Sequence, residues 1–438
     1  MKKRFGLLVL VCALVLCSLT GCGKKSLLDP DHPVTLTMWH NYGGDMQQTM
    51  DYLIDQFNST VGREEGVVIN VTAISSSSEL NKSLERIANG DPGAPQLPDI
   101  FTGYPRTAIG FQEKGMLVNF ADYFTGEDQA LYVEAFLEEG RLSDGGLYVF
   151  PLAKSTEILY LNQTLFDRFA AETGADEALL GTFEGIAELA RMYYHWTDAL
   201  TPDVPDDGKQ FYAADSWYNA VETGVEQLGE HFFIDGQLNT LSESYKRIYE
   251  TLRIPAVEGG FAIYDGYSSD LSKTGDLICS TGSSAGILFY GDTITHSDGS
   301  VEEVEYRILP YPVFEGGEKL ALQRGGGLMV AKSEEKREYA ACLFLRWLTQ
   351  PEQNLQFISR TGYLPVTRQA FEQEMESHME NVDDPQIAKM LRAVLSMYEE
   401  YRFYTPPNDG RLEDLSDAFE SEFKAEMKLN RSRHLAGE

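Results

Sequence analysis

Near its N-terminus the chain reads Val34-Thr-Leu-Thr-Met-Trp39, which alternates apolar and polar side chains as a β-strand with one buried face does. The strand runs into a glycine-rich loop, and residues 45–57 then carry apolar side chains at helical spacing. Further strands are predicted at residues 67–74 and 99–102, with a helix over residues 79–89 between them. This alternation predicts a right-handed parallel α/β unit, in which ligands gather beyond the carboxyl ends of the strands.

The length and composition of the chain restrict its class. It has 438 residues, of which 43% are hydrophobic and 11% aromatic, so we expect two lobes rather than one core. The formal net charge of −32 argues against binding to nucleic acid or to an anionic membrane face, because both would repel the protein. The seven histidines show no metal-binding spacing, and no phosphate loop or dinucleotide fingerprint is present. We therefore expect no metal and no cofactor.

The first residues have the pattern of a secretion signal. A positive segment, Lys2-Lys3-Arg4, precedes an apolar run over residues 5–19, which is too short to span a bilayer as a mature helix. The run ends in Leu19-Thr20-Gly21-Cys22, which resembles the lipobox of bacterial lipoproteins. This resemblance implies a signal peptide over residues 1–21 and a lipid on Cys22, whereas the alternative is an ordinary cleaved signal with an accidental cysteine.

Residues 22–33 are polar and rich in turn formers, so we predict a tether between the lipid and the folded part. Of the five cysteines, Cys12 and Cys17 leave with the signal, and Cys22 is the expected anchor. Cys279 and Cys342 remain, and they either pair or stay as buried free thiols. Both lie in apolar stretches, which favours free thiols.

Six segments of the remaining chain carry further motifs, namely Leu36-Thr-Met-Trp39-His40, Leu97-Pro-Asp-Ile-Phe101, Tyr148 to Asn162, Gly275 to Ser284, Arg324 to Leu348, and Thr361-Gly-Tyr-Leu-Pro-Val366. In this order they resemble the extracellular solute-binding proteins (family 1) of bacterial ABC importers, in the branch that binds sugars and glycerol phosphates. The resemblance implies an α/β, two-lobed periplasmic-binding-protein-like fold of type II, with hinge strands and a ligand cleft between the lobes. The N-terminal lobe would comprise residues 34–153 and 321–358, and the C-terminal lobe residues 154–320 and 359–438.

The resemblance also implies a function. A ligand that touches both lobes only when they are shut shifts the population toward the closed form, which membrane permease subunits then recognise. We expect a monomer that captures a carbohydrate, a mono- or oligosaccharide, on the outer face of the cell membrane. The alternative ligand is glycerol 3-phosphate, a glycerophosphodiester or another anionic sugar derivative.

A sugar site needs aromatic platforms for the apolar ring faces and a few polar groups of fixed geometry for the hydroxyls. The stacking candidates at loop positions are Trp39, Tyr42, Tyr104, Trp217 and Tyr363. The hydrogen-bonding candidates are Asn41, Glu79, Ser155, Ser284 and Arg324. For each aromatic residue the alternative is core packing, and for the serines it is turn chemistry.

The family resemblance supports three of these positions and adds a fourth, Gly326. Tyr363 matches a tyrosine that contacts ligand in the family, Ser155 and Ser284 match serines in the crossover and in a second-lobe loop, and Gly326 matches a glycine whose backbone approaches ligand.

The sequence departs from the glycerol-phosphate binders in one respect. They carry an acidic residue directly after the tyrosine that matches Tyr104, whereas Pro105 and Arg106 follow here, and their tyrosine before the second helix is replaced around Ser78. This departure puts phosphodiester specificity in doubt. Lys154, Arg324 and Arg402 are expected near the cleft, however, so an anionic ligand such as a uronic or phosphorylated sugar stays an alternative.

Enzyme classes fit the sequence less well. The segment Gly282-Ser-Ser284-Ala-Gly286 has the pattern of a nucleophile elbow, and Asp292 and His296 follow it, but within a dozen residues rather than across a sheet. A glycosidase needs only two carboxyl groups, yet no acidic residue lies in a recognisable catalytic motif. A purely structural lipoprotein or adhesin is the third alternative. We expect a binding protein that is not an enzyme.

Overall fold

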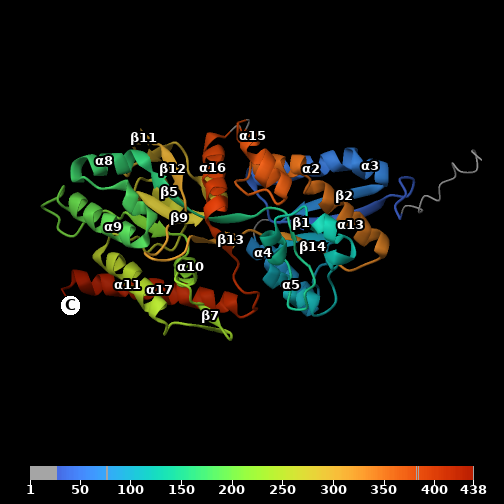
Figure 1. The fold of residues 1–438 in the computed structure, drawn as a ribbon, viewed down its shortest axis with the longest axis horizontal. Coiled ribbons are helices and arrows are strands. Elements are labelled where there is room, and N and C mark those ends of the chain that lie inside the picture. Colours follow the sequence, from blue (N-terminus) through green and yellow to red (C-terminus); the bar gives the residue numbers. More distant parts are fainter. Residues whose placement is uncertain (1–26, 75–76, 381, 383, 438) are drawn as a thin grey trace, which may run out of the picture.

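The computed structural model describes residues 27–74, 77–380, 382 and 384–437. It consists of two α/β lobes that lie side by side along the long axis of the molecule (Figure 1). The predicted signal peptide and the predicted lipidation site, Cys22, lie outside the described residues. None of the helices in the described ranges combines the length and the apolar character needed to cross a membrane.

The first lobe is built on a five-stranded sheet with the order β2-β1-β3-β14-β4. Its strands are β1 (Val34–His40), β2 (Val67–Ala73), β3 (Ile100–Gly103), β4 (Phe150–Pro151) and β14 (Gly327–Val330). The strands β1, β2 and β3 run parallel, as the alternating strand and helix pattern predicts, and β14 pairs antiparallel with β3 and β4.

Helices cover both faces of this sheet, because successive side chains along a strand point into two different hydrophobic cores. Ile100 packs in the main hydrophobic core, whereas its neighbour Phe101 packs in a second, smaller one. The helices on the main core are α2 (Gly44–Ser59), α3 (Val61–Glu65), α13 (Glu335–Leu348) and α14 (Pro351–Ile358). The helices on the smaller core are α4 (Ser77–Asn89) and α5 (Pro105–Gln112). This is the doubly covered arrangement that parallel strands require.

The second lobe is built on a sheet with the order β15-β13-β5-β9-β6, and β12 also pairs with β5. Its strands are β5 (Ser155–Asn162), β6 (Tyr212–Ala214), β9 (Cys279–Ser283), β12 (Tyr306–Leu309), β13 (Leu320–Arg324) and β15 (Arg402–Tyr404). All eight residues of β5 are buried, because neighbours pair with it on both edges and helices cover it.

The second lobe holds most of the remaining helices. They are α8 (Gln163–Thr173), α9 (Phe183–Asp198), α10 (Trp217–Gln227), α11 (Glu243–Glu258), α12 (Ser268–Lys273), α16 (Pro385–Glu400) and α17 (Leu412–Leu435). The shorter elements of the whole described chain, in both lobes, are η1 (Phe120–Asp122), α6 (Gly126–Gln129), α7 (Glu134–Glu138), η2 (Glu177–Gly181), β7 (Phe233–Ile234), β8 (Gln237–Leu238), η3 (Ser284–Phe289), β10 (Thr293–Thr295), β11 (Val301–Glu303), η4 (Gln369–Glu374) and α15 (Met375–Met379).

Two segments cross directly from one sheet to the other (Figure 1). Pro151 ends β4 in the first sheet and Ser155 begins β5 in the second, while Arg324 ends β13 and Gly327 begins β14. The crossings touch at Gly325, whose φ of +101° favours glycine and where a Cβ would lie 2.5 Å from the backbone oxygen of Ala153. Two short adjacent crossings are what a hinge between lobes requires.

The two remaining cysteines are both buried and both free, which confirms the favoured prediction of two unpaired thiols. Burial raises the pKa of Cys279 well above its ordinary value, as expected for a thiol in apolar surroundings.

Candidate ligand-binding cleft

A cavity of about 510 Å³ lies between the two lobes. Residues from both sheets and from the C-terminal segment line it, including Asn81, Tyr104, Arg106, Glu139, Ser155, Tyr218, Asn219, Glu222, Ser283, Gln323, Arg324, Tyr363, residues 405–409, Leu412, Glu413 and Ser416. The cavity has the size of a small-molecule site, and polar and apolar groups share its wall.

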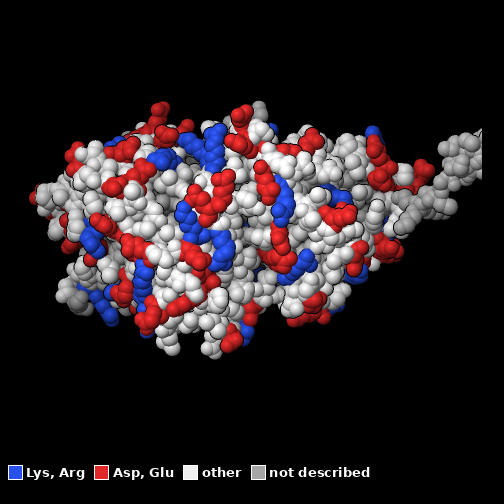
Figure 2. Space-filling model, viewed as in Figure 1, with Lys and Arg blue, Asp and Glu red and all other residues white. Residues whose placement is uncertain are grey.

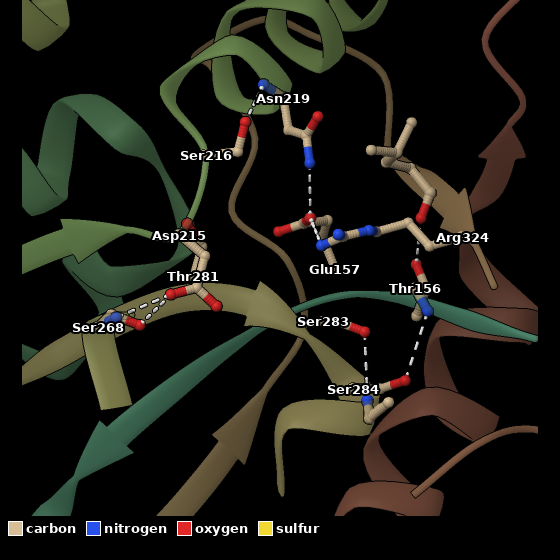
Figure 3. A network of polar contacts seen from close by, with 12 residues as sticks. Thr156, Glu157, Asp215, Ser216, Asn219, Ser268, Thr281, Ser283, Ser284 and Arg324 are labelled. Carbon is tan, nitrogen blue, oxygen red and sulfur yellow. Dashed lines mark hydrogen bonds and ion pairs between the residues drawn. The ribbon is translucent and has the colours of Figure 1, made fainter. Parts of the chain in front are cut away.

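The crossing strands form one wall of the cavity. Arg324 of β13 pairs with Ser155 of β5 in an antiparallel ladder, so both residues sit where the chain leaves the second sheet. From this position the guanidinium of Arg324 contacts the carboxylate of Glu157, with 2.8 Å between Nη1 and Oε1. Asn219 at the start of α10 donates its side-chain amide to the same oxygen over 3.0 Å, as Figure 3 shows.

The environment of this ion pair shifts both pKa values. Burial raises the pKa of Glu157, and the charge of Arg324 opposes that rise. Burial lowers the pKa of Arg324 and is the largest single effect, but the charges of Glu157, Tyr104 and Asp215 and the hydrogen bond to Glu157 together outweigh it, so the pKa of Arg324 is raised overall. The Arg324 side chain stays 38% exposed toward the cavity, whereas Glu157 is almost completely buried. Arg324 therefore meets the cavity as a cation that already has its counter-ion.

Two tyrosines offer aromatic surface to the cavity. Tyr104 follows β3 directly, is 38% exposed, and has the guanidinium of Arg106 5.4 Å from its ring centroid. Tyr363 is partly buried and stacks parallel to Phe357, with ring centroids 6.4 Å apart. Burial and the nearby Tyr104 raise the pKa of Tyr363 to about 12, so its hydroxyl stays protonated at neutral pH.

A buried ion pair lies beneath the crossings. Lys154 Nζ is 2.6 Å from a carboxylate oxygen of Glu139 and donates to the backbone oxygen of Gly325 over 3.0 Å. Gln323 of β13 donates its side-chain amide to the same carboxylate. Lys154 thus lies near the cavity, as expected, but it is 3% exposed and its ammonium group is satisfied by Glu139 and Gly325, so it is not among the lining residues.

The segment 405–413, which we call the strap, runs from the end of β15 in the second lobe into the first turn of α17 and lines one side of the cavity. Asn408 donates its side-chain amide to the backbone oxygens of Glu139 and Arg141 over 3.3 and 3.2 Å. Glu413, at the start of α17, forms a 2.9 Å ion pair with Arg106 of α5 in the first lobe. The strap therefore connects the two lobes without using the crossings.

A buried carboxyl group also reaches the cavity. Glu222 on α10 is 1% exposed and accepts hydrogen bonds from the hydroxyls of Tyr218 and Tyr404 over 3.3 and 3.4 Å, both at Oε1. Burial is the main cause that raises the pKa of Glu222 to about 8, and the nearby charge of Glu226 adds to it. At neutral pH this carboxyl is mostly protonated.

Of the residues predicted for the site, the structure brings Tyr104, Ser155, Arg324 and Tyr363 together at the cavity. Gly326 lies within the crossing from β13 to β14, where a Cβ would approach the backbone oxygen of Gly103 to 3.0 Å.

The prediction that Trp217 stacks on a ligand is wrong. Its side chain is 0% exposed, and its ring stacks on Phe423 of α17 with centroids 5.4 Å apart. Trp217 lies on the same face of α10 as Val221 and Val225, and this apolar stripe is buried in the main core instead of facing the cleft.

The predicted residues of the first lobe loops lie outside the cavity lining. Trp39 packs against the smaller core that α4 and α5 cover, and the ring of Tyr42 packs edge-on to Phe357. Asn41 accepts a hydrogen bond from the hydroxyl of Thr102 over 3.0 Å. Glu79 is exposed and pairs with Lys82 at 3.3 Å. In this conformation none of these four side chains lines the described cavity.

Two predicted residues of the second lobe also lie elsewhere. Ser284 is completely buried, and its hydroxyl accepts the backbone N–H of Thr156, which is a structural role. Arg402 is 59% exposed on the outer edge strand β15 and faces Glu318 at 3.5 Å. Neither residue lines the cavity, because Ser284 points into the lobe and Arg402 points to solvent.

These placements also bear on the nucleophile-elbow alternative. His296 pairs with Glu302 at 2.9 Å, while the Ser284 hydroxyl bonds to the backbone of β5, so the two do not form a serine–histidine pair. In the described part of the chain no group of three metal-ligating side chains is found.

Sequence reasoning missed several lining residues, above all Glu222, Asn219, Tyr218 and the strap. The strap carried a usable signal, because Thr405-Pro-Pro-Asn-Asp-Gly410 is a turn-rich run between a strand and a helix. Glu222 carried none, since an acidic residue within a helix usually faces solvent.

The chain matches the model of the bacterial extracellular solute-binding proteins over residues 52–389, which is well over half of its length. It belongs to this family. The solute-binding protein thus serves an ABC importer outside the cytoplasm, as predicted. Its curated relatives include the sn-glycerol-3-phosphate-binding periplasmic protein UgpB of Brucella abortus, 22% identical over 352 residues, with 78% of this chain and 77% of the relative covered.

Solved structures share the fold of the solute-binding protein. The cyclic alpha-maltosyl-1,6-maltose binding protein from Arthrobacter globiformis superimposes with a TM-score of 0.70 at 18% identity, covering 91% of this chain and 94% of that one. UgpB from Mycobacterium tuberculosis in complex with glycerophosphocholine gives a TM-score of 0.67 at 18% identity, covering 92% and 99%. These likenesses confirm the predicted two-lobed α/β fold.

Proposed function

We propose that this solute-binding protein captures a neutral carbohydrate in the cleft and delivers it to the permease subunits of an ABC importer. The observation that carries the proposal is the charge balance of the cavity. The arginines of its described lining, Arg106 and Arg324, each face a carboxylate already, at 2.9 and 2.8 Å. A phosphate group would have to compete with these carboxylates, whereas sugar hydroxyls can bond to paired charges without displacing them.

The remaining cavity wall supports the same ligand class. Tyr104 and Tyr363 supply aromatic surface for the apolar faces of sugar rings. The acidic lining residues offer a phosphate group no additional positive charge, because Glu222 is mostly protonated at neutral pH and Asp409 is already paired with Arg411. We place Tyr104, Ser155, Arg324 and Tyr363 in the binding site.

Capture works by closure of the lobes around the crossings. We propose lobe boundaries at residues 34–153 with 321–358 and at residues 154–320 with 359–438, which is supported by the short links between β4 and β5 and between β13 and β14. A ligand that contacts Tyr104 in one lobe and Asn219 in the other favours the closed state, because only that state makes both contacts.

A second candidate is an anionic ligand such as a glycerol phosphate. Two observations favour it: the UgpB relatives are sn-glycerol-3-phosphate-binding proteins, and the side chain of Arg324 is 38% exposed in the cavity. Binding of this ligand would require Glu157 to take up a proton or to give up part of its contact with Arg324.

We also propose that the protein is a monomeric lipoprotein without enzyme activity, anchored by a lipid on Cys22 after removal of residues 1–21. The tether 22–33 would let the lobes reach the permease. This part of the proposal is supported by the lipobox-like Leu19-Thr20-Gly21-Cys22 and by the family's extracellular location.

The decisive experiment is a thermal-shift screen followed by calorimetry on the mature soluble chain. The panel comprises maltose, maltotriose, a cyclic tetrasaccharide, mannobiose, sn-glycerol 3-phosphate and glycerophosphocholine. The proposal expects a stabilising shift with at least one saccharide and none with the phosphates. A shift with the phosphates alone would favour the second candidate, and cleavage of any saccharide during the incubation would show that the protein is an enzyme.

A further inference from the structure

The buried carboxyl of Glu222 is the least expected group in the cavity wall. It lies on α10, it is 1% exposed, and it lines the cavity between Tyr218 and the strap. We propose that Glu222 contacts the carbohydrate as a protonated carboxyl group, which donates a hydrogen bond to a ligand hydroxyl and couples capture to a proton. This inference rests on the proposed carbohydrate-binding function.

The hydrogen bonds of Glu222 fix the place of the proton. The hydroxyls of Tyr218 and Tyr404 both donate to Oε1, so this oxygen acts as the carbonyl-like acceptor of the group. The proton of a neutral carboxyl then resides on Oε2, which the tyrosines do not engage. Because the carboxyl lines the cavity, we infer that Oε2–H is the donor that meets a sugar hydroxyl.

The charges around Glu222 favour this neutral form. Glu226 lies one turn further along α10, is 6% exposed, and has His231 3.1 Å from its carboxylate. On α17, Glu420 accepts the backbone N–H of Tyr218 and pairs with Lys424 at 3.0 Å. These partner contacts leave Glu222 facing an acidic neighbour and two phenol groups.

The other elements packed on α10 bring no cation to Glu222 among the described residues. Arg324 of β13 is a cation of the cavity lining, but its guanidinium contacts Glu157. Across the cavity, Glu139 pairs with Lys154, Glu413 pairs with Arg106, and the strap residue Asp409 pairs with Arg411. The helix α11 packs on α10 through apolar side chains such as Ile248.

The pKa of Glu222 agrees with this geometry. Burial raises it, the hydrogen bond from Tyr218 lowers it, the charge of Glu226 raises it and the hydrogen bond from Tyr404 lowers it, and the result is about 8. Closure of the lobes on a ligand removes further water from the carboxyl, which penalises its charged form more strongly. The complex therefore holds the proton more tightly than the free protein does, so binding weakens as the pH rises past about 8.

The test combines a direct and an indirect measurement on the mature full-length protein. Infrared spectroscopy of the ligand-free protein near pH 7 should show a protonated carboxyl C=O band that is absent in Glu222→Gln. Calorimetric titration with the saccharide that gives the largest thermal shift should show a Kd that rises about tenfold between pH 7 and pH 9, because only the protonated fraction binds well.

Two variants and one control make the outcome specific. Glu222→Gln keeps a neutral donor, so its affinity should stay flat across the same pH range. Glu226→Gln removes the neighbouring charge and should move the midpoint of the wild-type profile to lower pH. Glu243→Gln, on the exposed surface of α11, removes a carboxylate remote from the cavity and should leave the profile unchanged.

An infrared band that persists in Glu222→Gln, or a wild-type affinity that does not change with pH, would overturn the inference. In the second case a saccharide still binds, so the proposed function stands while the inference fails. If none of the saccharides in the panel binds, the proposed carbohydrate function and the ligand contact both fail, while the infrared band decides whether Glu222 carries the proton.

Discussion

Arg324 and Glu157 form an ion pair in the cavity wall with an N–O distance of 2.8 Å, and Glu157 lies behind Arg324 with only 3% of its side chain exposed. The pair presents a cation to the ligand space and keeps the matching anion out of the ligand's reach. In this arrangement Arg324 can donate hydrogen bonds to hydroxyl groups while its charge is balanced. The pair thus influences which ligand charge the cleft accepts.

The substitution Glu157→Gln should change the ligand preference. It removes the buried counter-ion and keeps the shape of the side chain, so Arg324 becomes available to a phosphate. We expect the affinity for sn-glycerol 3-phosphate to rise about tenfold, which corresponds to about 1.4 kcal/mol, while the affinity for a neutral saccharide changes less. Calorimetry with both ligands measures the two effects, and an equal change in both would contradict the role given to the pair.

The aromatic candidates fall into two groups, because Tyr104 and Tyr363 line the cavity whereas Trp217 is buried in the core. Tyr104→Ala and Tyr363→Ala should each weaken carbohydrate binding by at least ~1 kcal/mol, since each removes a platform from the cavity wall. Trp217→Ala should leave the affinity of the folded protein nearly unchanged and reduce the free energy of unfolding by about 3–5 kcal/mol, because Trp217 is completely buried.

These three variants need two measurements, ligand titration and denaturant unfolding, on the same preparations. A loss of affinity in Trp217→Ala without a loss of stability would mean that its ring reaches the ligand after all. Unchanged affinity in both tyrosine variants would remove Tyr104 and Tyr363 from the site.

The strap should affect the balance between open and closed lobes. Glu413→Gln removes the exposed ion pair with Arg106, which is worth about 0–1 kcal/mol, and Asn408→Ala removes two further contacts across the cleft. We expect the lobes of the double variant to open, which gives a larger radius of gyration in ligand-free small-angle scattering. Its radius of gyration should also change less with salt concentration than that of the wild type.

The control for the strap is Glu79→Gln, which breaks an exposed ion pair with Lys82 inside the first lobe. It should leave the scattering profile unchanged. Identical profiles for the double variant and the wild type would show that the strap does not hold the lobes together.

The stability of the ligand-free protein should depend on pH through Glu222. Its pKa is about 8 in the folded state and near 4.5 in the unfolded chain, so the folded state binds more protons between these values and loses stability as the pH rises from about 4.5 to about 8. Glu222→Gln abolishes this loss. Its Tm should exceed that of the wild type at pH 8 to 9, and the difference should shrink toward pH 5.

Cys22 can be tested in cells. Cys22→Ser should move the protein from the membrane fraction to the medium or to the soluble extracytoplasmic fraction, because no lipid can be attached. Metabolic labelling with a fatty-acid analogue should give signal in the wild type alone. If the variant still sediments with membranes and the wild type carries no label, the lipoprotein prediction is wrong.

The first lobe was predictable because its signals are local. The strand at Val34–His40 alternates along the sequence, and the apolar residues Met50, Leu53 and Phe57 recur at helical spacing, so neither assignment depends on distant contacts. Tyr104 was predicted as a site residue for a related reason, since it follows directly on a parallel strand at the edge where ligands gather.

The second lobe and its part of the site depend on distant contacts. Trp217 stands near a loop in sequence, and only the packing of α17, some two hundred residues later, shows that its ring is covered. Glu222 likewise accepts a hydrogen bond from Tyr404 and lines the same cavity as the strap, and both Tyr404 and the strap come from the end of the chain. Local periodicity carries no information on such contacts, so the residue types were visible but their neighbours were not.

The place of β14 in the first sheet delays the completion of that sheet during synthesis. This strand lies between β3 and β4, yet it is translated only after residues 154–320, the larger part of the second lobe. The ribosome must therefore reach residue 330 before the sheet can close, and a partly made chain lacks a central strand. Such late, non-local closure is slow. For a protein that works outside the cytoplasm, we expect this late closure to favour export, because the first sheet of the emerging polypeptide stays incomplete until β14 has been made.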